Sequence, residues 1–151
     1  MPLARVAVFL ESEVAEGWVL RQEQRVSDGL NRGESLHVQA LGATAEPGPW
    51  QDYYPDDVIA VAVEPRHHPS PLRVSRRRHM MELSAYPYIF FGTAHMPPGA
   101  DPLRYAATAS QRWLPLTNCT VTSGNASWAV EVLLVNLDRV ARALEPAESR
   151  P

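Results

Sequence analysis

The pattern of hydrophobic positions begins with an apolar run near the amino terminus, in residues 6–10. Val6, Val8 and Leu10 alternate there with Ala7 and Phe9. A period of two places successive side chains on opposite faces of an extended chain, which is the pattern of a half-buried β-strand. Residues 81–83 repeat the pattern more weakly, so a strand is predicted near the start of each half of the chain.

Short apolar runs bounded by turn-forming residues predict further strands. They lie in residues 17–20, 36–41, 89–94, 113–121 and 130–136, and a closing strand is expected within 57–65 and within 138–146. Residues 46–55 hold three prolines and a glycine, which argue against a full strand there or at least shorten it. The pattern as a whole predicts a mainly β protein.

A helix-start signal follows the second expected strand in each half. Residues 97–99, two prolines and a glycine, interrupt the strand pattern, and Asp101 can then cap a helix with its side-chain oxygen. In the first half Ser27 or Asp28 can take the capping position, and Asn31 and Gly33 are available to end the helix. Each half is therefore expected to contain one short helix.

The two halves share sequence anchors in the same order, which indicates an internal duplication. The closing segment 57–65 aligns without gaps on 138–146. Three further anchors pair Gly17-Trp18-Val19 with Gly92-Thr93-Ala94, Asp28-Gly29-Leu30 with Asp101-Pro102-Leu103, and Leu36-His37-Val38 with Leu114-Pro115-Leu116. The chain is thus read as two diverged copies of one β-rich unit.

The strand and helix content of each copy is typical of a small, strongly bent barrel. We expect two SH3/Sm-like or split β-barrel units, with one short helix each, packed as a pseudo-twofold pair. The expected parts are a first repeat 1–65, an arginine-rich linker 66–78, a second repeat 79–146 and a disordered tail 147–151. Units this small hold little core, so the copies should bury a face against each other.

Three motifs resemble those of a family of small bacterial all-β domains of unknown function. They are the turn Arg25-Val26-Ser27-Asp28-Gly29-Leu30-Asn31, the strand Leu114-Pro115-Leu116-Thr117-Asn118, and a closing hairpin that begins Val132-Leu133-Leu134-Val135-Asn136. The first motif is kept in the first copy and the others in the second. The resemblance implies a bacterial source and an all-β fold, and it carries no established activity. A weaker resemblance to Sm-like RNA-binding barrels rests on strand order alone.

Charge and cysteine content limit the partners and the cellular compartment that we expect. The formal net charge is −3, with an acidic first repeat and a basic segment 66–78, so neither repeat has the balance of a phosphate binder. The single Cys119 excludes a disulfide within the chain and argues against a cysteine-based zinc site, which fits a reducing cytoplasm. No apolar run reaches the ~18 residues of a membrane span. A cytoplasmic protein without a membrane partner is expected.

An acidic loop with exposed-looking aromatic residues is the first candidate site. Trp50, Tyr53 and Tyr54 stand among aspartates, whose charge would repel a nucleic-acid backbone. Tryptophan and tyrosine supply large contact areas at low entropic cost, which is typical of protein-binding anchors. The loop could bind a partner protein or dock on the arginines of the linker, and both alternatives stay open.

A run of arginines is the second candidate site. Arg73, Arg76, Arg77 and Arg78 form a basic patch that could grip the phosphates of a nucleic acid or a lipid surface. The simpler interpretation, a solvated linker that offsets the acidic first repeat, is favoured because the aromatic side chains of a nucleic-acid platform are missing nearby.

A polar turn is the third candidate. Arg25, Asp28 and Asn31 offer a guanidinium, a carboxylate and an amide from one turn, which could bind a ligand. A capped helix with a local ion pair is favoured instead, because the second copy keeps only the capping Asp101.

Metal binding and catalysis find little support in the sequence. His37, His67, His68, His79 and His95 lack metal-ligand spacing, and Cys119 has no neighbour in sequence that would lower its pKa. The motifs of nucleophilic hydrolases, phosphate loops, dinucleotide-binding folds and zinc proteases are absent from the sequence. No cofactor, metal or catalytic residue is predicted.

These observations favour a non-enzymatic binding or scaffold module that acts through protein–protein contacts. Two alternatives stay open. One is an Sm-like nucleic-acid-binding protein that uses the arginine-rich linker, and its signature would be steep weakening of binding with salt. The other is a small-molecule sensor or enzyme with a pocket between the repeats. The sequence leaves the oligomeric state undetermined.

Overall fold

The computed structural model describes residues 3–20, 26–41, 48–64, 77–96, 104 and 112–145. The first half contains β1 (Leu3–Phe9), β2 (Val14–Leu20), α1 (Val26–Asn31), β3 (Leu36–Ala40), β4 (Trp50–Tyr53), a 3-10 helix η1 (Pro55–Asp57) and β5 (Ala60–Val63). The second half contains β6 (Arg77–Ala85), β7 (Tyr88–Met96), β8 (Trp113–Ser123), β9 (Ala126–Asn136), a 3-10 helix η2 (Leu137–Arg139) and β10 (Arg142–Leu144). The helix expected at Asp101, most of the linker and the tail 147–151 lie outside the described residues.

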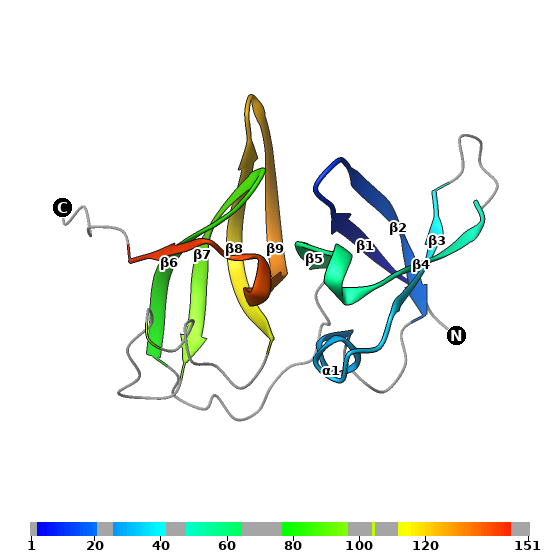
Figure 1. Ribbon diagram of the computed structural model, residues 1–151, viewed down its shortest axis with the longest axis horizontal. Coiled ribbons are helices and arrows are strands. Elements are labelled where there is room, and N and C mark those ends of the chain that lie inside the picture. Colours follow the sequence, from blue (N-terminus) through cyan, green and yellow to red (C-terminus); the bar gives the residue numbers. More distant parts are fainter. Residues whose placement is uncertain are drawn as a thin grey trace.

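The ten strands form one antiparallel open sheet in the order β10-β6-β7-β8-β9-β5-β1-β2-β3-β4 (Figure 1). The prediction of a mainly β protein is confirmed. The expected closed barrels are wrong for the described part of the chain, because β5 pairs with β1 along one edge and with β9 along the other. A strand with both edges occupied cannot also close the first unit into a barrel.

Each half of the sheet has the same strand order. The first half runs β5-β1-β2-β3-β4 and the second runs β10-β6-β7-β8-β9, so the last strand of each half lies beside its first strand. The halves meet through β5 and β9, which hold different places in this order. A twofold axis would join equivalent strands, so the expected pseudo-twofold pairing is wrong and the halves are joined head to tail.

Strand register supports two of the four sequence anchors, Gly17 with Gly92 and Leu36 with Leu114. Gly17 and Gly92 hold equivalent places in β2 and β7, and neither has room for a side chain. A Cβ on Gly92 would lie 2.6 Å from Cys119 Sγ, and one on Gly17 would meet the Gln39 carbonyl. Both glycines therefore allow the third strand of their half to approach closely.

The closing segments align differently from the sequence match. The N–H of Val58 donates to the Pro55 carbonyl, and the N–H of Val140 donates to the Leu137 carbonyl in the same way. Val58 is therefore equivalent to Val140, whereas the ungapped alignment pairs it with Arg139. The structural equivalence is shifted by one residue, which in a strand exchanges the inward and outward faces.

Two hydrophobic cores lie on opposite faces of the sheet. The amino-terminal core contains Ala4, Val6, Val8, Val19, Leu30, Leu36, Val38, Tyr53, Val58, Val61, Trp113 and Leu134. The carboxyl-terminal core contains Phe9, Ile59, Ala60, Met81, Leu83, Ala85, Tyr88, Phe90, Ala94, Leu114, Leu116, Cys119, Val121, Leu133 and Val135. Each half of the sheet thus curls around its own core.

The strands β5 and β9 serve both cores. Val61 and Leu134 face the amino-terminal core, while the adjacent Ala60, Leu133 and Val135 face the carboxyl-terminal core. Successive side chains of a strand point to opposite faces, so these two strands have hydrophobic contacts on both. This explains why their sequences read as continuous apolar runs rather than as alternating patterns.

Each half also sends a large side chain into the core of the other. Phe9 of β1 packs edge-on against Tyr88 and Trp128, with ring centroids 5.3 and 5.5 Å away. In return Trp113 of β8 is buried in the amino-terminal core. Its backbone N–H donates to Asn31 Oδ1 of α1 at 3.1 Å. The two halves are therefore one packed body.

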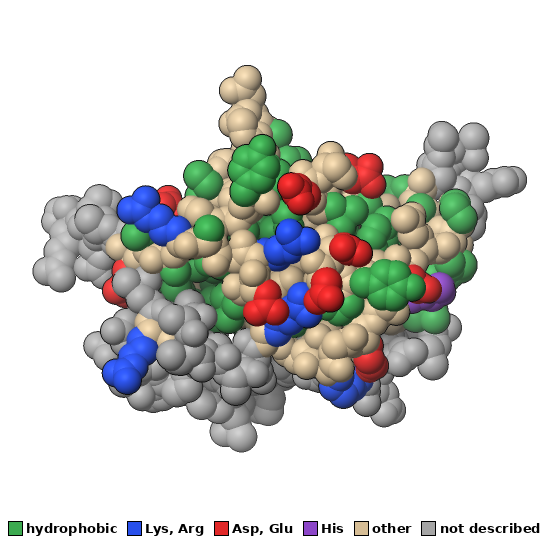
Figure 2. Space-filling model, viewed as in Figure 1, with side chains coloured by type: hydrophobic (Ala, Val, Ile, Leu, Met, Phe, Trp, Pro, Cys, Tyr) green, Lys and Arg blue, Asp and Glu red, His purple; other side chains and the backbone are tan. Residues whose placement is uncertain are grey.

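The joint between the halves, where β5 pairs with β9, also carries charged groups. In Figure 2, basic and acidic side chains gather over the middle of the molecule. Arg112 lies 2.9 Å from a carboxylate oxygen of Asp56 and 3.0 Å from one of Asp138. Arg139 donates to the backbone carbonyl of Asp56 at 2.7 Å. Two arginines of the second half thus bind the η1 segment of the first half.

Candidate functional site

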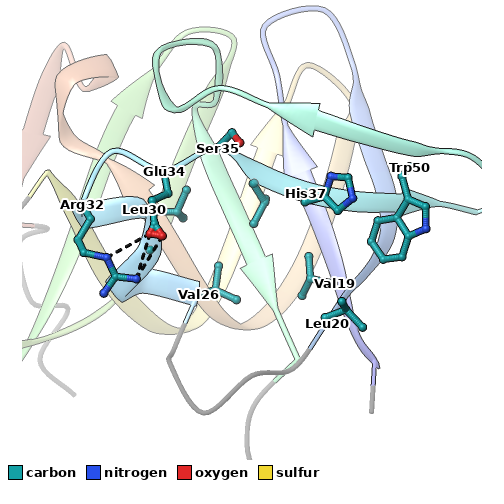
Figure 3. A pocket seen from close by; sticks show the side chains of 11 residues that line it. Val19, Leu20, Val26, Leu30, Arg32, Glu34, Ser35, His37 and Trp50 are labelled. Atoms are coloured by element: carbon teal, nitrogen blue, oxygen red, sulfur yellow. Dashed lines mark hydrogen bonds and ion pairs between the residues drawn. The ribbon is translucent and has the colours of Figure 1, made fainter. Parts of the chain in front are cut away.

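An open groove lies between α1, the end of β2, the start of β3 and β4 (Figure 3). It encloses about 210 Å³ and opens to solvent. Its lining residues are Val19, Leu20, Val26, Gly29, Leu30, Arg32, Glu34, Ser35, Leu36, His37 and Trp50. We call this the α1–β4 groove. Concave sites with an apolar lining and a few polar groups are the usual places of ligand and partner binding.

The floor of the groove is built from core residues. Val19, Leu30 and Leu36 are buried and belong to the amino-terminal core. Leu20 and Trp50 extend this apolar surface to the rim, where both are exposed. The groove therefore leads from solvent to the edge of the core, and an apolar side chain of a partner would lose its hydration there.

Trp50 is held in place by a histidine. The rings of His37 and Trp50 are stacked, with centroids 4.6 Å apart and planes 6° from parallel. The Nδ1 atom of His37 is within hydrogen-bond distance of Asp52 Oδ1. Asp52 lies directly opposite His37 in the β3–β4 pair, so the strand register fixes the histidine and the histidine supports the indole.

The opposite wall carries an ion pair. Nε and Nη2 of Arg32 donate to Glu34 Oε2 at 3.1 and 3.0 Å, as Figure 3 shows. The chain reaches this wall through Gly33, whose φ of 79° lies in the left-handed region. The N–H of Gly33 donates to the Leu30 carbonyl and that of Glu34 to the Gly29 carbonyl. The prediction that Gly33 ends the helix is confirmed.

The three aromatic residues that were predicted to form a binding loop differ in their exposure to solvent. Trp50 lines the groove, and Tyr54, just after β4, is 61% exposed. Tyr53 is only 9% exposed and lies in the amino-terminal core. Burial, with a smaller contribution from the charge of Glu13, raises the pKa of Tyr53. A short strand, β4, does form in this proline-rich stretch.

The other predicted sites lie partly outside the described residues. Arg73 and Arg76 of the basic patch and Arg25 of the polar turn fall there. Arg77 and Arg78 belong to β6, where they pair with Met96 and His95. The backbone of Asp28 lies in α1. Of the polar turn, Asn31 has a described contact, the hydrogen bond to the Trp113 N–H noted above.

A second groove, of about 390 Å³, runs along the joint between the halves. It is lined by Arg5, Val6, Ala7, Phe9, Glu16, Ala62, Val63, Glu64, Trp128, Ala129, Val130 and Glu131. Arg5 lies 3.7 Å from Glu16 and sits over the Trp18 ring at 5.5 Å. The guanidinium is thus occupied by neighbours within the chain.

Metal and thiol chemistry find no assembled site among the described residues, where no three histidine, cysteine or acidic side chains gather. Burial raises the pKa of the Cys119 thiol to about 12, so it stays protonated at neutral pH. No helix in the described part of the chain is long and apolar enough to cross a membrane.

No protein-family model, curated protein or solved structure matches this chain. The class of this protein is therefore assigned from its fold and its candidate site alone. It is an all-β protein with one ten-stranded antiparallel sheet and an apolar groove beside an exposed, supported tryptophan.

Several groove residues were missed by sequence reasoning. Leu20 and His37 were not predicted as neighbours of Trp50, because their proximity depends on how β2, β3 and β4 pair. Glu34, on the opposite wall, was not predicted as a groove residue either. One signal was present: Leu20 ends a strand as an exposed apolar residue. The opposition of His37 and Asp52 is set by register, which a single sequence does not reveal.

Proposed function

We propose that this chain is a non-enzymatic protein-binding module, whose α1–β4 groove takes an apolar side chain of a partner protein. The observation that carries the proposal is the state of Trp50. Its indole is 40% exposed at the rim of an apolar groove, yet it is stacked on His37 and so is already ordered before binding. A preordered aromatic anchor loses little entropy when a partner arrives.

Two neighbouring features support a protein partner. Tyr54 adds a second exposed aromatic ring next to β4. Asp52 and the Arg32–Glu34 pair give the groove a polar rim of both signs. An apolar centre with aromatic anchors and a polar rim is the usual composition of a protein interface.

We also propose that the two halves are copies of one SH3- or Sm-like unit, kept in tandem. The identical strand order of the halves and the equivalent places of Gly17 and Gly92 support this origin. In this account the units are opened and joined through β5 and β9 instead of closing separately.

The test is selection of peptides from a random phage-displayed library on the full chain, followed by measurement of their affinity by isothermal titration calorimetry. We expect peptides with an aromatic or branched apolar residue, and we expect Trp50→Ala to weaken them about tenfold or more. Leu20→Ser should have a similar effect, because it removes the other exposed apolar side chain of the groove rim.

The matched control is Tyr86→Ala, which removes an aromatic ring that is 83% exposed in the β6–β7 turn, far from the groove in the sheet order. Equal affinity of the selected peptides for the Trp50→Ala variant and for the natural chain would contradict the proposal. Peptides weakened by Tyr86→Ala instead would place the binding surface on the other half.

A further inference from the structure

The two ends of the sheet are complementary. The strand β4 ends one side and β10 ends the other, and within the described residues nothing pairs with their outer edges. By strand order β4 is the equivalent of β9, and β10 is the equivalent of β5. Those two equivalents are the strands that join the halves within the chain.

We propose that a second copy of this chain pairs its β10 with β4 of the first, so that copies associate head to tail by repeating the internal joint. This goes beyond the proposed function, because it pairs the backbone edges of the sheet, although Glu34 and β4 border both the α1–β4 groove and the proposed joint. A heterologous joint of this kind leaves a free edge at each end and can be repeated.

The internal joint specifies the register of the proposed one. Within the chain Val61 lies opposite Leu134, and Ala62 lies opposite Leu133. The equivalent residues at the free edges are Ala143 opposite Asp52, and Leu144 opposite Gln51. An exposed strand edge offers unpaired N–H and C=O groups that this register would pair.

Leu144 gives the proposed joint an apolar contact. It is equivalent to Ala62, which packs against the core of the other half. Leu144 itself is half-buried at the end of the sheet. In the assembly it would lie on the face of β4 that carries Tyr53 and would extend the amino-terminal core of the next copy.

Charge makes the proposed joint weaker than the internal one. The arginines that bind the η1 segment, Arg112 and Arg139, are replaced by Glu34 and Asp57 at the equivalent places in the first half. Their target Asp56 is replaced by Asp138 in the second half. Glu34, Asp56 and Asp57 of one copy would therefore meet Asp138 of the other, four carboxylates where the internal joint has two guanidinium groups and two carboxylates. High salt should therefore strengthen the association.

The first test is sedimentation velocity of the full chain from micromolar to millimolar concentration, at low and at high salt. We expect a mass that grows with concentration and grows further with salt. The double variant Glu34→Arg/Asp57→Arg, which copies the internal joint, should associate about tenfold more tightly. Leu144→Asp should abolish association.

The control for Leu144→Asp is Ile89→Asp, which also removes an exposed apolar side chain but lies in β7, away from both edges. Circular dichroism should show both variants folded, and the control should associate like the natural chain. Association in the double arginine variant alone, or association that survives Leu144→Asp, would overturn the proposal for the natural protein.

A second test determines which edges meet between copies. Asp52→Cys and Ala143→Cys each place one thiol on one edge, and residues opposite each other in a sheet lie within reach of a disulfide. Mild oxidation should cross-link the mixture of the two variants and neither variant alone. Cross-links within a single variant would mean that equivalent edges meet, which contradicts a head-to-tail joint. Cross-linking in none of the samples would overturn it as well.

Discussion

At the scale of single residues, Asn136 connects the two halves. Its side chain is fully buried. The amide nitrogen donates to the carbonyls of Pro55 and Val58 at 3.1 and 2.9 Å, and the amide oxygen accepts from Asp138 N and Arg112 Nε, each at 3.0 Å. A residue of the second half therefore satisfies backbone groups of the first half that would otherwise be buried without partners.

Asn136→Ala should lower the free energy of unfolding by about 2–3 kcal/mol, because it leaves buried carbonyls unpaired. Urea denaturation followed by circular dichroism measures this. The control is Asn125→Ala in the exposed turn of the β8–β9 hairpin, which should change stability by less than about 0.5 kcal/mol. Equal effects of the two substitutions would contradict the role of Asn136.

Cys119 makes stability depend on alkaline pH. Burial raises the pKa of its thiol to about 12 in the folded state. The unfolded chain loses this proton at a lower pH, so the stabilising contribution is complete below the unfolded pKa of about 8.5 and is lost as pH rises toward the folded value. Burial also raises the pKa of Tyr53 and Tyr88, which act in the same direction.

The free energy of unfolding should therefore fall above about pH 9, and it should fall less steeply in a Cys119→Ala variant. Urea titrations at several alkaline pH values give the two slopes. At pH 8 a thiol-exchange reagent should label Cys119 only after denaturant is added. Rapid labelling of the folded protein would show that the thiol is not buried as described.

At the scale of elements, β4 places two aromatic side chains in different surroundings: Trp50 in the α1–β4 groove and Tyr53 in the amino-terminal core. Trp50 and Tyr53 differ by an odd number of positions, so they point to opposite faces of the strand. The sequence alone showed a proline-rich aromatic loop, in which these residues looked equivalent. Their roles differ only because β4 pairs with β3 in one register.

This difference is testable by substitution. Tyr53→Ala should cost about 3 kcal/mol of folding stability, because it opens a cavity in the amino-terminal core. Trp50→Ala should cost less than about 1 kcal/mol and should instead impair binding. Thermal and urea unfolding of the two variants provide the comparison, and a larger stability loss for Trp50→Ala would reverse the assignment.

Local patterns in the sequence thus predicted the strands other than β4 and the end of α1, and they matched Gly17 with Gly92. They did not predict the joint, since which strands share an edge is a property of the whole sheet. The continuous apolar runs at 58–63 and 132–135 were the available signal. Such runs indicate strands buried on both faces, but they do not identify the partner strand.

At the scale of the whole molecule, the halves should unfold together. Phe9 packs in the carboxyl-terminal core and Trp113 in the amino-terminal core, so each core needs both halves. Phe9→Ala removes a first-half side chain from the second-half core and should cost about 3–5 kcal/mol. Tryptophan fluorescence and far-ultraviolet circular dichroism should report one coincident transition for the natural chain and for this variant.

Two separated transitions would instead show that the cores are independent. In that case Phe9→Ala would shift one transition and leave the other in place. Calorimetry provides the same distinction, since the calorimetric and van't Hoff enthalpies agree only for a single cooperative unit.

The double-sided burial of β5 and β9 has a consequence for how this sequence can vary. In most strands of the sheet, tolerance to substitution should alternate with a period of two, because every second side chain faces solvent. At 59–62 and 133–135 that alternation should vanish, and neighbouring positions should be equally intolerant of polar replacements. A saturation mutagenesis scan with a folding reporter should show low tolerance to substitution at every consecutive position of these two segments, where the halves meet.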